Sequence, residues 1–305
     1  SNTAPPSYSP RSLKPMPPST TQAITFHSLL TTLSDTPIRY ENVGLLDEAL
    51  RVVPLDRIIE EAEFDLELIT AQAASLGKLP QYGIQDCMVK ALMKWFKYDF
   101  FTWVNTPPCN HCGHETISQG AMQPTPEEKA LGAGKTEIFI CTDPACGQID
   151  RFPRYSDVWT LMQTRRGRCG EWANTFTMLC RAMGWRARWV WNSEDHVWTE
   201  VWSLHANRWI HVDACENAYD KPMLYTREWK RRLAYCIAFS REGAMDVTRR
   251  YVRDRHLQAL PRSRCSEENL LYTILEVRAK RRARMTPEEV RRCEKEDELE
   301  EKELR

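Results

Sequence analysis

This sequence of 305 residues lacks an excess of either charge, and it lacks a long apolar run. Its 42 Lys and Arg side chains balance 42 Asp and Glu side chains, so no overall field draws the chain to a polyanion or to a membrane surface. No apolar run approaches the roughly 18 residues that span a bilayer. We therefore expect neither a nucleic acid nor a membrane among its partners.

The sequence also has no recognisable secretory leader, although it contains 11 cysteines, an odd number. Cysteines with CxxC spacing and no leader are typical of a reducing compartment, where they serve as metal ligands or working thiols rather than as disulfides. Residue 1 is Ser rather than Met, which leaves open a missing upstream targeting or partner domain. The hydrophobic fraction of 42% is sufficient for a real core.

Composition and periodicity favour an α+β fold and divide the chain into five parts. Residues 1–22 form a Pro/Ser-rich disordered leader, and residues 23–106 form a helical N-terminal part. Residues 107–153 form a cysteine-bearing segment with few large apolar residues. Residues 154–255 form a core in which a helix packs on antiparallel strands, and residues 256–305 form a helical C-terminal part. We expect early helices at 26–33, 45–77 (broken at Pro54) and 84–103, and strands at 189–191, 196–202, 209–213, 234–239 and 244–252.

Four cysteines in two pairs bracket a loop in the third part: Cys109, Cys112, Cys141 and Cys146. Four thiolates in two pairs suit tetrahedral Zn²⁺, which prefers soft sulfur ligands. The first pair has CxxC spacing, whereas the second is stretched by two residues. His111 and His114 are alternative ligands, and four unrelated buried cysteines are the alternative without a metal. Because no open coordination position is implied, we predict a structural zinc ion that holds this segment together.

Cys169 begins a run with helical periodicity, in which Trp172 and Phe176 share one face. At a helix start, unpaired backbone N–H groups and the helix dipole favour a thiolate over a thiol. Arginines at positions 165, 166 and 168 precede the cysteine, and Gly170 follows it. We therefore expect an open, electropositive setting for this thiol.

A candidate base and a candidate acid follow Cys169. His196 begins an alternating stretch, and Asp213 ends a second one after a turn near 204–207, so an antiparallel hairpin makes these two ends neighbours. The order Cys, His, Asp is that of a papain-like triad. We predict Cys169 as the nucleophile, His196 as the general base and acid, and Asp213 as the residue that orients the imidazole.

This triad suits attack on an acyl carbon, which gives a thioester that water hydrolyses. Backbone N–H groups at Cys169 would supply part of an oxyanion hole, and the sequence does not identify a second donor. Two competing interpretations are a redox thiol and a remnant of an enzyme fold that is now used for binding. Cys180 and Cys236 lie in apolar runs and fit small buried hydrophobes. Many tryptophans lie between Trp172 and Trp209, which fits core packing or a stacking surface for a sugar.

Several long motifs resemble those of the cytoplasmic peptide:N-glycanases: GRCGEWAN, WNSEDHVWTEVW and RWIHVDACENAYDKP, with RFPRY, LAYCIAF and DVTRRY around them. The resemblance covers roughly residues 95–251. It implies a transglutaminase-like core related to papain, and an amidase that removes N-linked glycans from misfolded glycoproteins by cutting the asparagine side-chain amide. The family's nucleophile, histidine and aspartate fall on Cys169, His196 and Asp213.

The same resemblance implies further contacts. The family's sugar-binding positions point to Glu216 and Trp229, with Trp198 as a weaker candidate. The family's two CxxC pairs imply zinc, although the second knuckle here is wider. Denatured N-glycoproteins are the implied substrates, and proteasomal shuttle proteins of the ubiquitin-like/ubiquitin-associated type are implied partners of the helices near 26–33 and 286–305. The implied localisation is cytoplasmic, with the nucleus left open.

Two alternatives stay open at this point. One is a cysteine peptidase or transglutaminase on the same core, which would differ from an amidase in its substrate groove. The other is a non-enzymatic binding module, because the transglutaminase-like domain of a DNA-repair family shares the core without the triad. The basic stretches at 249–264 and 278–284 could contact phosphates in that case.

Overall fold

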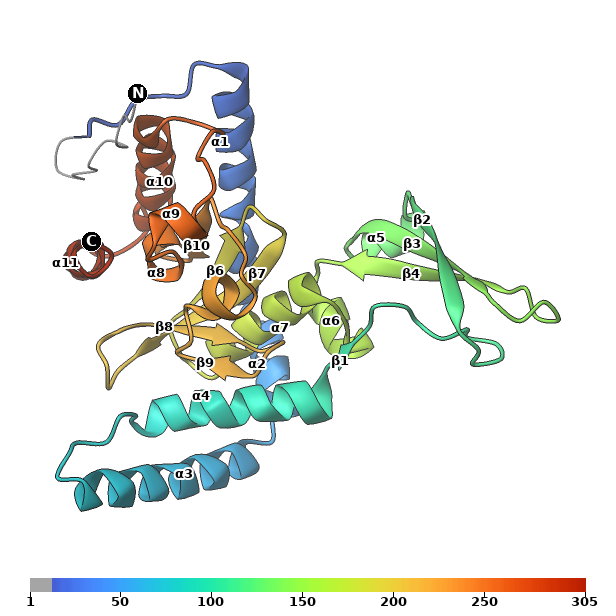
Figure 1. Cartoon of the computed structure of the whole chain (residues 1–305), viewed down its shortest axis with the longest axis horizontal. Helices are drawn as coiled ribbons and strands as arrows, with labels where there is room; N and C mark the ends of the chain where they lie inside the picture. The colour runs from blue at the N-terminus through green and yellow to red at the C-terminus, as the bar shows by residue number, and fades with distance from the viewer. Residues whose placement is uncertain (1–12) are drawn as a thin grey trace. The chain divides into compact units, whose positions relative to one another are not determined.

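The computed structural model describes residues 13–305, and Figure 1 shows the course of the chain. Residues 1–12 of the predicted disordered leader lie outside the described residues. Residues 13–20 have no regular secondary structure, and the first helix begins at Thr21, one residue after its N-cap Thr20. Within residues 13–305, no helix combines the length and the apolar character that a membrane crossing requires.

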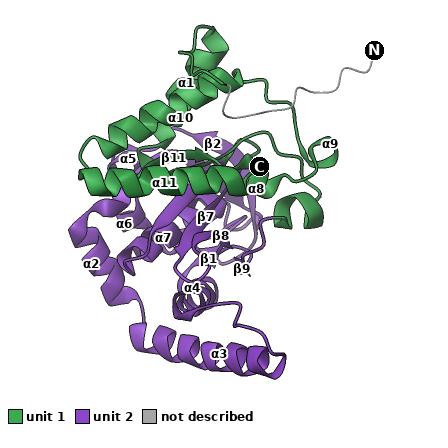
Figure 2. Ribbon diagram, turned by 90° about the vertical axis from the view of Figure 1, so that its left-hand side faces the viewer, with its two compact units in different colours: residues 1–38, 192–194, 223–305 green, residues 39–191, 195–222 purple. Residues whose placement is uncertain are grey.

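The chain forms two compact units, which Figure 2 colours separately. The first unit combines the chain up to Ile38 with residues 192–194 and 223–305. The second unit contains residues 39–191 and 195–222. The second unit contains Cys169, His196, Asp213 and the four paired cysteines, so the predicted triad and the predicted metal site both lie within this unit.

The first unit is mainly helical. Its elements are α1 (Thr21–Leu33), η4 (Leu224–Glu228), β10 (Cys236–Ser240), β11 (Gly243–Asp246), α8 (Thr248–Tyr251), α9 (Arg255–Gln258), α10 (Glu267–Arg282) and α11 (Pro287–Glu303), while η2 (Thr36–Glu41) crosses the boundary. The predicted strand over 244–252 is wrong in its second half. Strand β11 stops at Asp246 because its carboxylate accepts a hydrogen bond from the Thr248 backbone N–H at 3.0 Å, which starts a helical turn.

The second unit begins with helices α2 (Val43–Val52), α3 (Leu55–Ser75) and α4 (Ile84–Trp95). The predicted break at Pro54 is confirmed, because α2 and α3 meet there. The predicted helix over 84–103 is too long. A π-helical turn, η3 (Phe96–Phe100), follows α4, and Thr102–Trp103 form strand β1, which pairs in parallel with β5 (Arg166–Gly167). The strand pairing outweighs the helical pattern of this stretch.

A three-stranded antiparallel sheet and a short helix occupy the cysteine-bearing segment. The strands are β2 (Thr116–Met122), β3 (Ala133–Cys141) and β4 (Ile149–Tyr155), in the order β2-β3-β4, with α5 (Pro126–Ala130) between β2 and β3. The sequence analysis predicted no strands here. Polar and glycine residues conceal the alternation, since six of the seven β2 residues are exposed.

The core of the second unit consists of α6 (Val158–Thr164), α7 (Cys169–Ala182) and the strands β6 (Ala187–Asn192), β7 (His196–Ser203), β8 (Arg208–Asp213) and β9 (Ala218–Tyr219). These strands are neighbours in chain order, and α7 packs against β7. Helix α7 is buried along most of its length. Phe96 packs against Trp172 and Phe176 of α7 at centroid distances of 5.3 and 5.4 Å. The predicted α+β fold with a helix on an antiparallel sheet is confirmed.

Candidate functional site

Cys169 is the first residue of α7, as its position before the helical run predicted. Its predecessor Arg168 is the N-cap, and the Arg168 backbone N–H donates to Glu171 Oε2 at 3.0 Å, which closes a capping box. The thiol is half-buried. It therefore lies at the positive end of the helix dipole and within reach of solvent.

The hairpin β7–β8 brings the candidate base and acid together. His196 Nε2 lies 3.0 Å from Asp213 Oδ2, and both side chains are buried, at 9% and 1% exposure. The register pairs Thr199 with Val212 and Glu200 with His211, so Asp213 faces His196 diagonally on the same side of the sheet. Long side chains cover that diagonal distance, and the hydrogen bond forms.

Two backbone groups hold the aspartate. Asp213 Oδ1 accepts hydrogen bonds from the backbone N–H of Cys215 at 2.9 Å and of Glu216 at 3.3 Å, while Oδ2 faces His196. The carboxylate therefore has a single orientation. Lys97 of η3 donates to the Cys215 carbonyl at 2.6 Å and supports the same loop.

Cys169 is the second group, after Asp213, that raises the pKa of His196. Burial of the imidazole works against its charge and lowers its pKa, but hydrogen bonds and charge interactions with Asp213 and Cys169 outweigh burial and raise the pKa to about 9. At neutral pH the ring is protonated in this arrangement. The structure thus joins the three predicted residues into a thiol–imidazole–carboxylate series.

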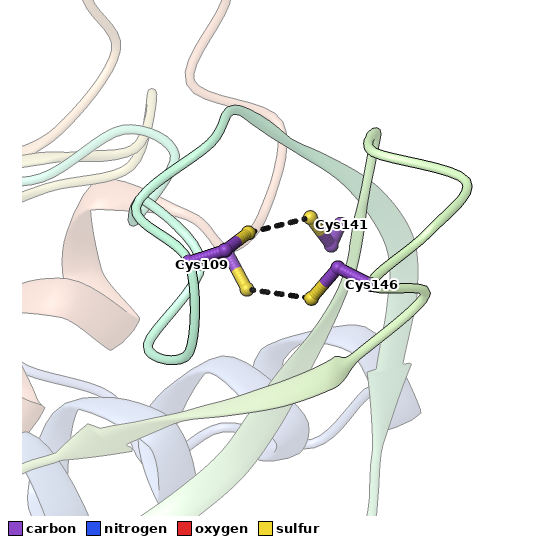
Figure 3. Close-up of side chains that lie close together, drawn as sticks. Cys109, Cys141 and Cys146 are labelled. Atoms are coloured by element: carbon purple, nitrogen blue, oxygen red, sulfur yellow. Dashed lines mark hydrogen bonds between the residues drawn. The ribbon is translucent and has the colours of Figure 1, made fainter.

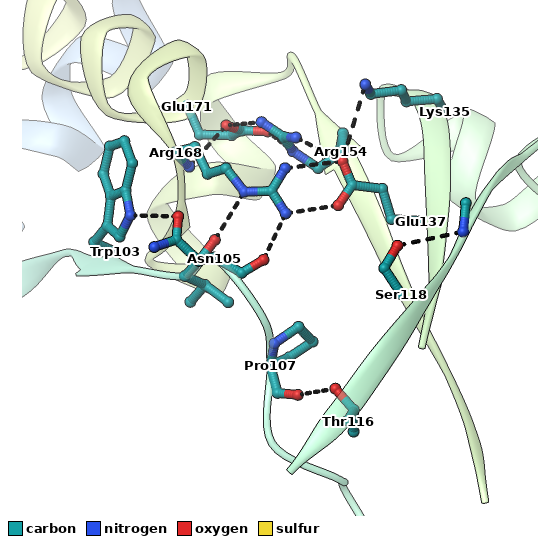
Figure 4. Close-up of polar contacts among 12 residues, drawn as sticks. Trp103, Asn105, Pro107, Thr116, Ser118, Lys135, Glu137, Arg154, Arg168 and Glu171 are labelled. Atoms are coloured by element: carbon teal, nitrogen blue, oxygen red, sulfur yellow. Dashed lines mark hydrogen bonds and ion pairs between the residues drawn. The ribbon is translucent and has the colours of Figure 1, made fainter. Parts of the chain in front are cut away.

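A closed polar network ties the start of α7 to the three-stranded sheet (Figure 4). The Arg168 guanidinium donates to both carboxylate oxygens of Glu137 on β3, at 3.0 and 2.7 Å. Arg154 on β4 donates to Glu137 at 2.9 Å and to both oxygens of Glu171, at 2.5 and 2.7 Å. Burial favours a higher pKa for Glu137, but the hydrogen bonds from the two arginines outweigh it and lower the pKa. The network fixes the residue next to Cys169 from two strands.

The arginines that precede Cys169 contact other side chains. Arg168 is neutralised by Glu137. The Arg165 guanidinium lies over the Phe100 ring at 4.4 Å, and that of Arg166 lies over Phe152 at 5.3 Å. These contacts hold the segment before α7 in place, and Arg165 and Arg166 keep their positive charges there.

The predicted sugar contacts have different surroundings. Trp198 is 1% exposed, and its ring packs beside the His196 imidazole at 5.6 Å. Glu216 is exposed, three residues beyond Asp213. Trp229 belongs to the first unit, where it is half-buried against Tyr225, with ring centroids 5.2 Å apart. Most tryptophans between 172 and 209 are buried, which favours the core-packing interpretation: Trp172, Trp189, Trp198, Trp202 and Trp209.

Trp103 lies beside the segment that leads into α7. Its strand β1 pairs with β5 so that Trp103 lies opposite Gly167, and its ring packs near Trp172 at 6.1 Å. The indole Nε1 donates to Asn105 Oδ1 at 2.9 Å, and the residue is 43% exposed. No sequence signal indicated this, because the whole cysteine-bearing segment separates β1 from β5.

The four paired cysteines form one cluster, as Figure 3 shows. All four sulfur atoms lie within 4.8 Å of one another, with Cys109 and Cys146 at 3.8 Å and Cys112 and Cys141 at 3.4 Å. The widened knuckle keeps a turn, since Cys146 N–H donates to the Asp143 carbonyl at 3.0 Å. This cluster could hold one metal ion, as the spacing predicted.

The two histidine alternatives differ from the cysteines. His114 belongs to a second, overlapping group with Cys112 and Asp143, whereas His111 belongs to neither group among the described residues. Both imidazoles are exposed. Cys180 and Cys236, which the sequence analysis assigned to the core, are fully buried.

Comparison with known proteins agrees with this geometry. The transglutaminase-like superfamily matches residues 115–214, and the Rad4 transglutaminase-like domain matches residues 190–305. A Rad4–Rad23 complex crosslinked to undamaged DNA has a similar fold, with a TM-score of 0.52 and 15% identity over 92% of this chain and 57% of that chain. At that identity the likeness concerns the fold alone.

Closer relatives exist among curated proteins. Protein png-1 of Neurospora crassa is 49% identical over 88% of this chain, and the chain spans 64% of its length. A peptide-N(4)-(N-acetyl-beta-glucosaminyl)asparagine amidase of Yarrowia lipolytica is 42% identical over 91% of this chain, which spans 76% of that enzyme. The chain belongs to the peptide-N(4)-(N-acetyl-beta-glucosaminyl)asparagine amidase family.

Proposed function

We propose that this protein is an amidase that hydrolyses the side-chain amide bond between asparagine and an N-linked glycan. The observation that carries the proposal is the pair His196 Nε2 and Asp213 Oδ2 at 3.0 Å, with Cys169 as the other group that raises the pKa of the imidazole. The named activity of the Yarrowia relative, at 42% identity, supports the same reaction.

In this reaction the Cys169 thiolate attacks the side-chain carbonyl carbon, a C–S bond forms, and negative charge develops on the carbonyl oxygen. The C–N bond then breaks, and the His196 imidazolium gives its proton to the departing glycosylamine nitrogen. Water attacks the resulting thioester while His196 accepts a proton. The C–S bond breaks, and the asparagine has become an aspartate. The raised pKa of His196 suits the first proton transfer, because the ring carries a proton at neutral pH.

The oxyanion needs at least two donors. The backbone N–H of Cys169 is one, since it is unpaired at the start of a helix. We propose the indole N–H of Trp103 as the second, because β1 brings this exposed side chain next to the segment that leads into α7. Breaking its hydrogen bond to Asn105 would free the N–H for substrate.

Glu216 and Trp229 remain proposed sugar contacts, and exposure supports Glu216 in particular. For Trp198 we propose a supporting role as well, because its buried ring packs against His196 and restricts the imidazole. Replacement of Glu216 should therefore raise KM for the glycan, whereas replacement of Trp198 should lower kcat.

We propose Zn²⁺ as the ion of the cysteine cluster. Four thiolates at the usual Zn–S distance of about 2.3 Å form a tetrahedron with edges of about 3.8 Å. The two measured sulfur pairs, at 3.8 and 3.4 Å, are consistent with such a tetrahedron. Bound there, the ion would hold the two knuckles together and take no part in the reaction.

The non-enzymatic alternative has little support from the two basic stretches. Within the first unit, Arg250 pairs with Glu300 at 2.8 Å, and Arg262 pairs with Asp246 at 2.6 Å. Several other arginines of these stretches have carboxylate partners in the same unit: Arg278, Arg281 and Arg282. Paired arginines offer few positive charges to phosphates.

The proposed substrates are denatured N-glycoproteins, and the proposed localisation is the cytoplasm, with the nucleus left open. We further propose a shuttle protein of the ubiquitin-like/ubiquitin-associated type as a partner. This rests on the family resemblance, and the Rad4 structure of similar fold contains Rad23.

The test is glycan release from denatured ribonuclease B. Wild-type protein should release the glycan and convert the asparagine to aspartate, and Cys169→Ala and His196→Ala should abolish release while urea unfolding remains cooperative. Failure of the wild-type protein to release glycan, with a titratable Cys169 thiol, would contradict the proposal. Cleavage of an unglycosylated peptide would favour the peptidase alternative.

A further inference from the structure

Strand β2 lies at an edge of the three-stranded sheet, and in the part of the chain that the structure describes β3 is its only strand partner. Residues 117–122 are all exposed. Among the described residues, the backbone–backbone hydrogen bonds of this stretch are those of the ladder to β3, and the Gly120 N–H donates to Ser118 Oγ at 3.3 Å. An edge of this kind presents a row of unpaired N–H and C=O groups, which can pair with another extended chain.

One face of β2 borders a cavity of about 340 Å³. Ser118 and Ala121 line it together with their cross-strand partners Phe139 and Glu137. The opposite wall includes Asn105 and Thr106, while Arg168, next to the nucleophile, also lines the cavity. The cavity therefore connects the edge strand with the residue that precedes Cys169.

The other face of β2 carries an apolar ladder. Ile117 pairs with Ile140 of β3, and Ile140 pairs with Ile149 of β4, so three isoleucines lie side by side. Ile117 is 59% exposed and Ile149 is 56% exposed. Large β-branched side chains in a row at this exposure favour apolar contact with a partner.

The middle of the edge is shaped for close approach of a backbone. The register shifts between Ser118 and Ala121, which leaves Gly120 in a left-handed conformation with a φ of +92°. A side chain at Gly120 would meet no atom of this protein within 4 Å. The glycine is thus demanded by its backbone conformation, and the space above it is open.

We propose that the β2 edge binds an extended polypeptide, the segment of an unfolded chain that flanks the glycosylated asparagine. The added strand makes backbone hydrogen bonds that require no particular sequence. Because successive side chains of a strand point to opposite faces, they alternate between the cavity beside Arg168 and the isoleucine ladder. The inference rests on the proposed function for its choice of substrate.

The two faces of β2 and its open edge together indicate an unfolded polypeptide as the occupant. A free glycan could fill the cavity but has no backbone to pair with β2 and no apolar side chain for the ladder. A folded protein has few extended segments with free N–H and C=O groups, so binding should require an unfolded chain. The remaining candidate occupant is the β2 strand of a second copy of this protein, and a measurement of the oligomeric state tests it.

The experiment measures binding without catalysis. Cys169→Ala protein is titrated against fluorescein-labelled, reduced and alkylated ribonuclease A, which carries no glycan, and anisotropy is recorded. Ile117→Lys is expected to weaken binding about tenfold. Leu131→Lys is the matched control, because Leu131 is 50% exposed in the same segment but lies outside β2, and binding should stay within about twofold.

Unchanged binding by Ile117→Lys, an equal loss by Leu131→Lys, or equal binding of native ribonuclease A would overturn the inference. A dimer that dissociates on Ile117→Lys substitution would assign the edge to a second copy instead and overturn it as well. Glycan release from denatured ribonuclease B is measured separately on active protein. Absence of glycan release contradicts the proposed function alone. The binding measurement tests independently whether the β2 edge binds an unfolded chain.

Discussion

Arg168, the residue before the candidate nucleophile, donates two hydrogen bonds to Glu137, at 3.0 and 2.7 Å. Glu137 lies on β3 of the cysteine-bearing segment, and Arg168 caps the helix that begins with Cys169. The cysteine-bearing segment is therefore joined to the start of α7 by a charge-assisted, bidentate contact. The position of the Cys169 thiol therefore depends on Arg168 and Glu137, which take no part in the proposed reaction steps.

The first prediction concerns Glu137→Gln. Loss of the carboxylate charge leaves Arg168 and Arg154 without a shared partner, so the free energy of unfolding should fall by about 1–3 kcal/mol and kcat/KM by about tenfold. Urea unfolding and glycan release measure both. Glu128→Gln is the control, because Glu128 makes the same bidentate contact with Arg151, at 2.8 Å, within the segment. It should destabilise comparably and leave kcat unchanged; equal losses of activity would contradict a positioning role.

The second prediction concerns pH. The pKa of His196 is about 9 in the folded protein, above its ordinary value near 6.5, so protonation contributes stability. That contribution, of order 3 kcal/mol, is complete below about pH 6.5 and is lost as pH rises through about 9. Asp213→Asn removes a partner that raises the pKa, and burial then lowers it. Urea midpoints from pH 6 to 10 should fall for wild type, and the variant should show a much weaker dependence; parallel curves would count against the pairing.

The third prediction concerns metal. Purified protein should contain one zinc ion per chain by elemental analysis, and Cys141→Ser should lose it with a clear fall in Tm, because an apo segment has little apolar surface to keep its strands together. Cys265→Ser is the control, since Cys265 is half-buried and outside the cluster. Its zinc content should not change. A chelator that leaves Tm unmoved would refute a structural ion.

The fourth prediction contrasts two glycines beside the nucleophile. A Cβ at Gly167 would lie 2.4 Å from Glu171 Cβ, so Gly167→Ala should disturb the cap and destabilise the protein. A Cβ at Gly170 would meet nothing within 4 Å, so Gly170→Ala should stabilise α7 by about 0.5 kcal/mol.

The same methyl group at position 170 would occupy open space next to Cys169, on the path of the proposed substrate. We therefore expect Gly170→Ala to raise KM for glycoprotein substrate while thermal stability rises. Glycan-release kinetics and Tm on the same preparation measure the two effects. A variant that is more stable and fully active would show that the open space is not used by substrate.

The hairpin of the candidate site could be read from the sequence. Alternating residues from His196 and up to Asp213 predicted two strands whose ends meet, and the register bears this out with a diagonal contact. The position of Cys169 at a helix start was equally local, because the apolar face of α7 has a clear helical period. Local periodicity and short loops determine such features, so no distant contact needs to be known.

The network at Arg168 could not be read in this way. Glu137 and Arg154 are charged residues on strands whose alternation is hidden by exposed and glycine residues, and nothing in their spacing relates them to Cys169. The arginines before Cys169 predicted a positive field, and the structure pairs Arg168 with Glu137 while Arg165 and Arg166 lie over aromatic rings. Only the paired strands decide which carboxylate meets which guanidinium.

The sequence by itself determined the candidate reactive residues, the helix that begins with Cys169, the β7–β8 hairpin and the cysteine pairs, because each depends on residue chemistry at short spacing. The tertiary structure decided what surrounds them: the parallel pairing that brings Trp103 beside the site, the strands that fix Arg168, and the open edge of β2. These contacts join residues far apart in the chain. Their partners are selected by strand pairing and packing, which no local pattern of side chains encodes.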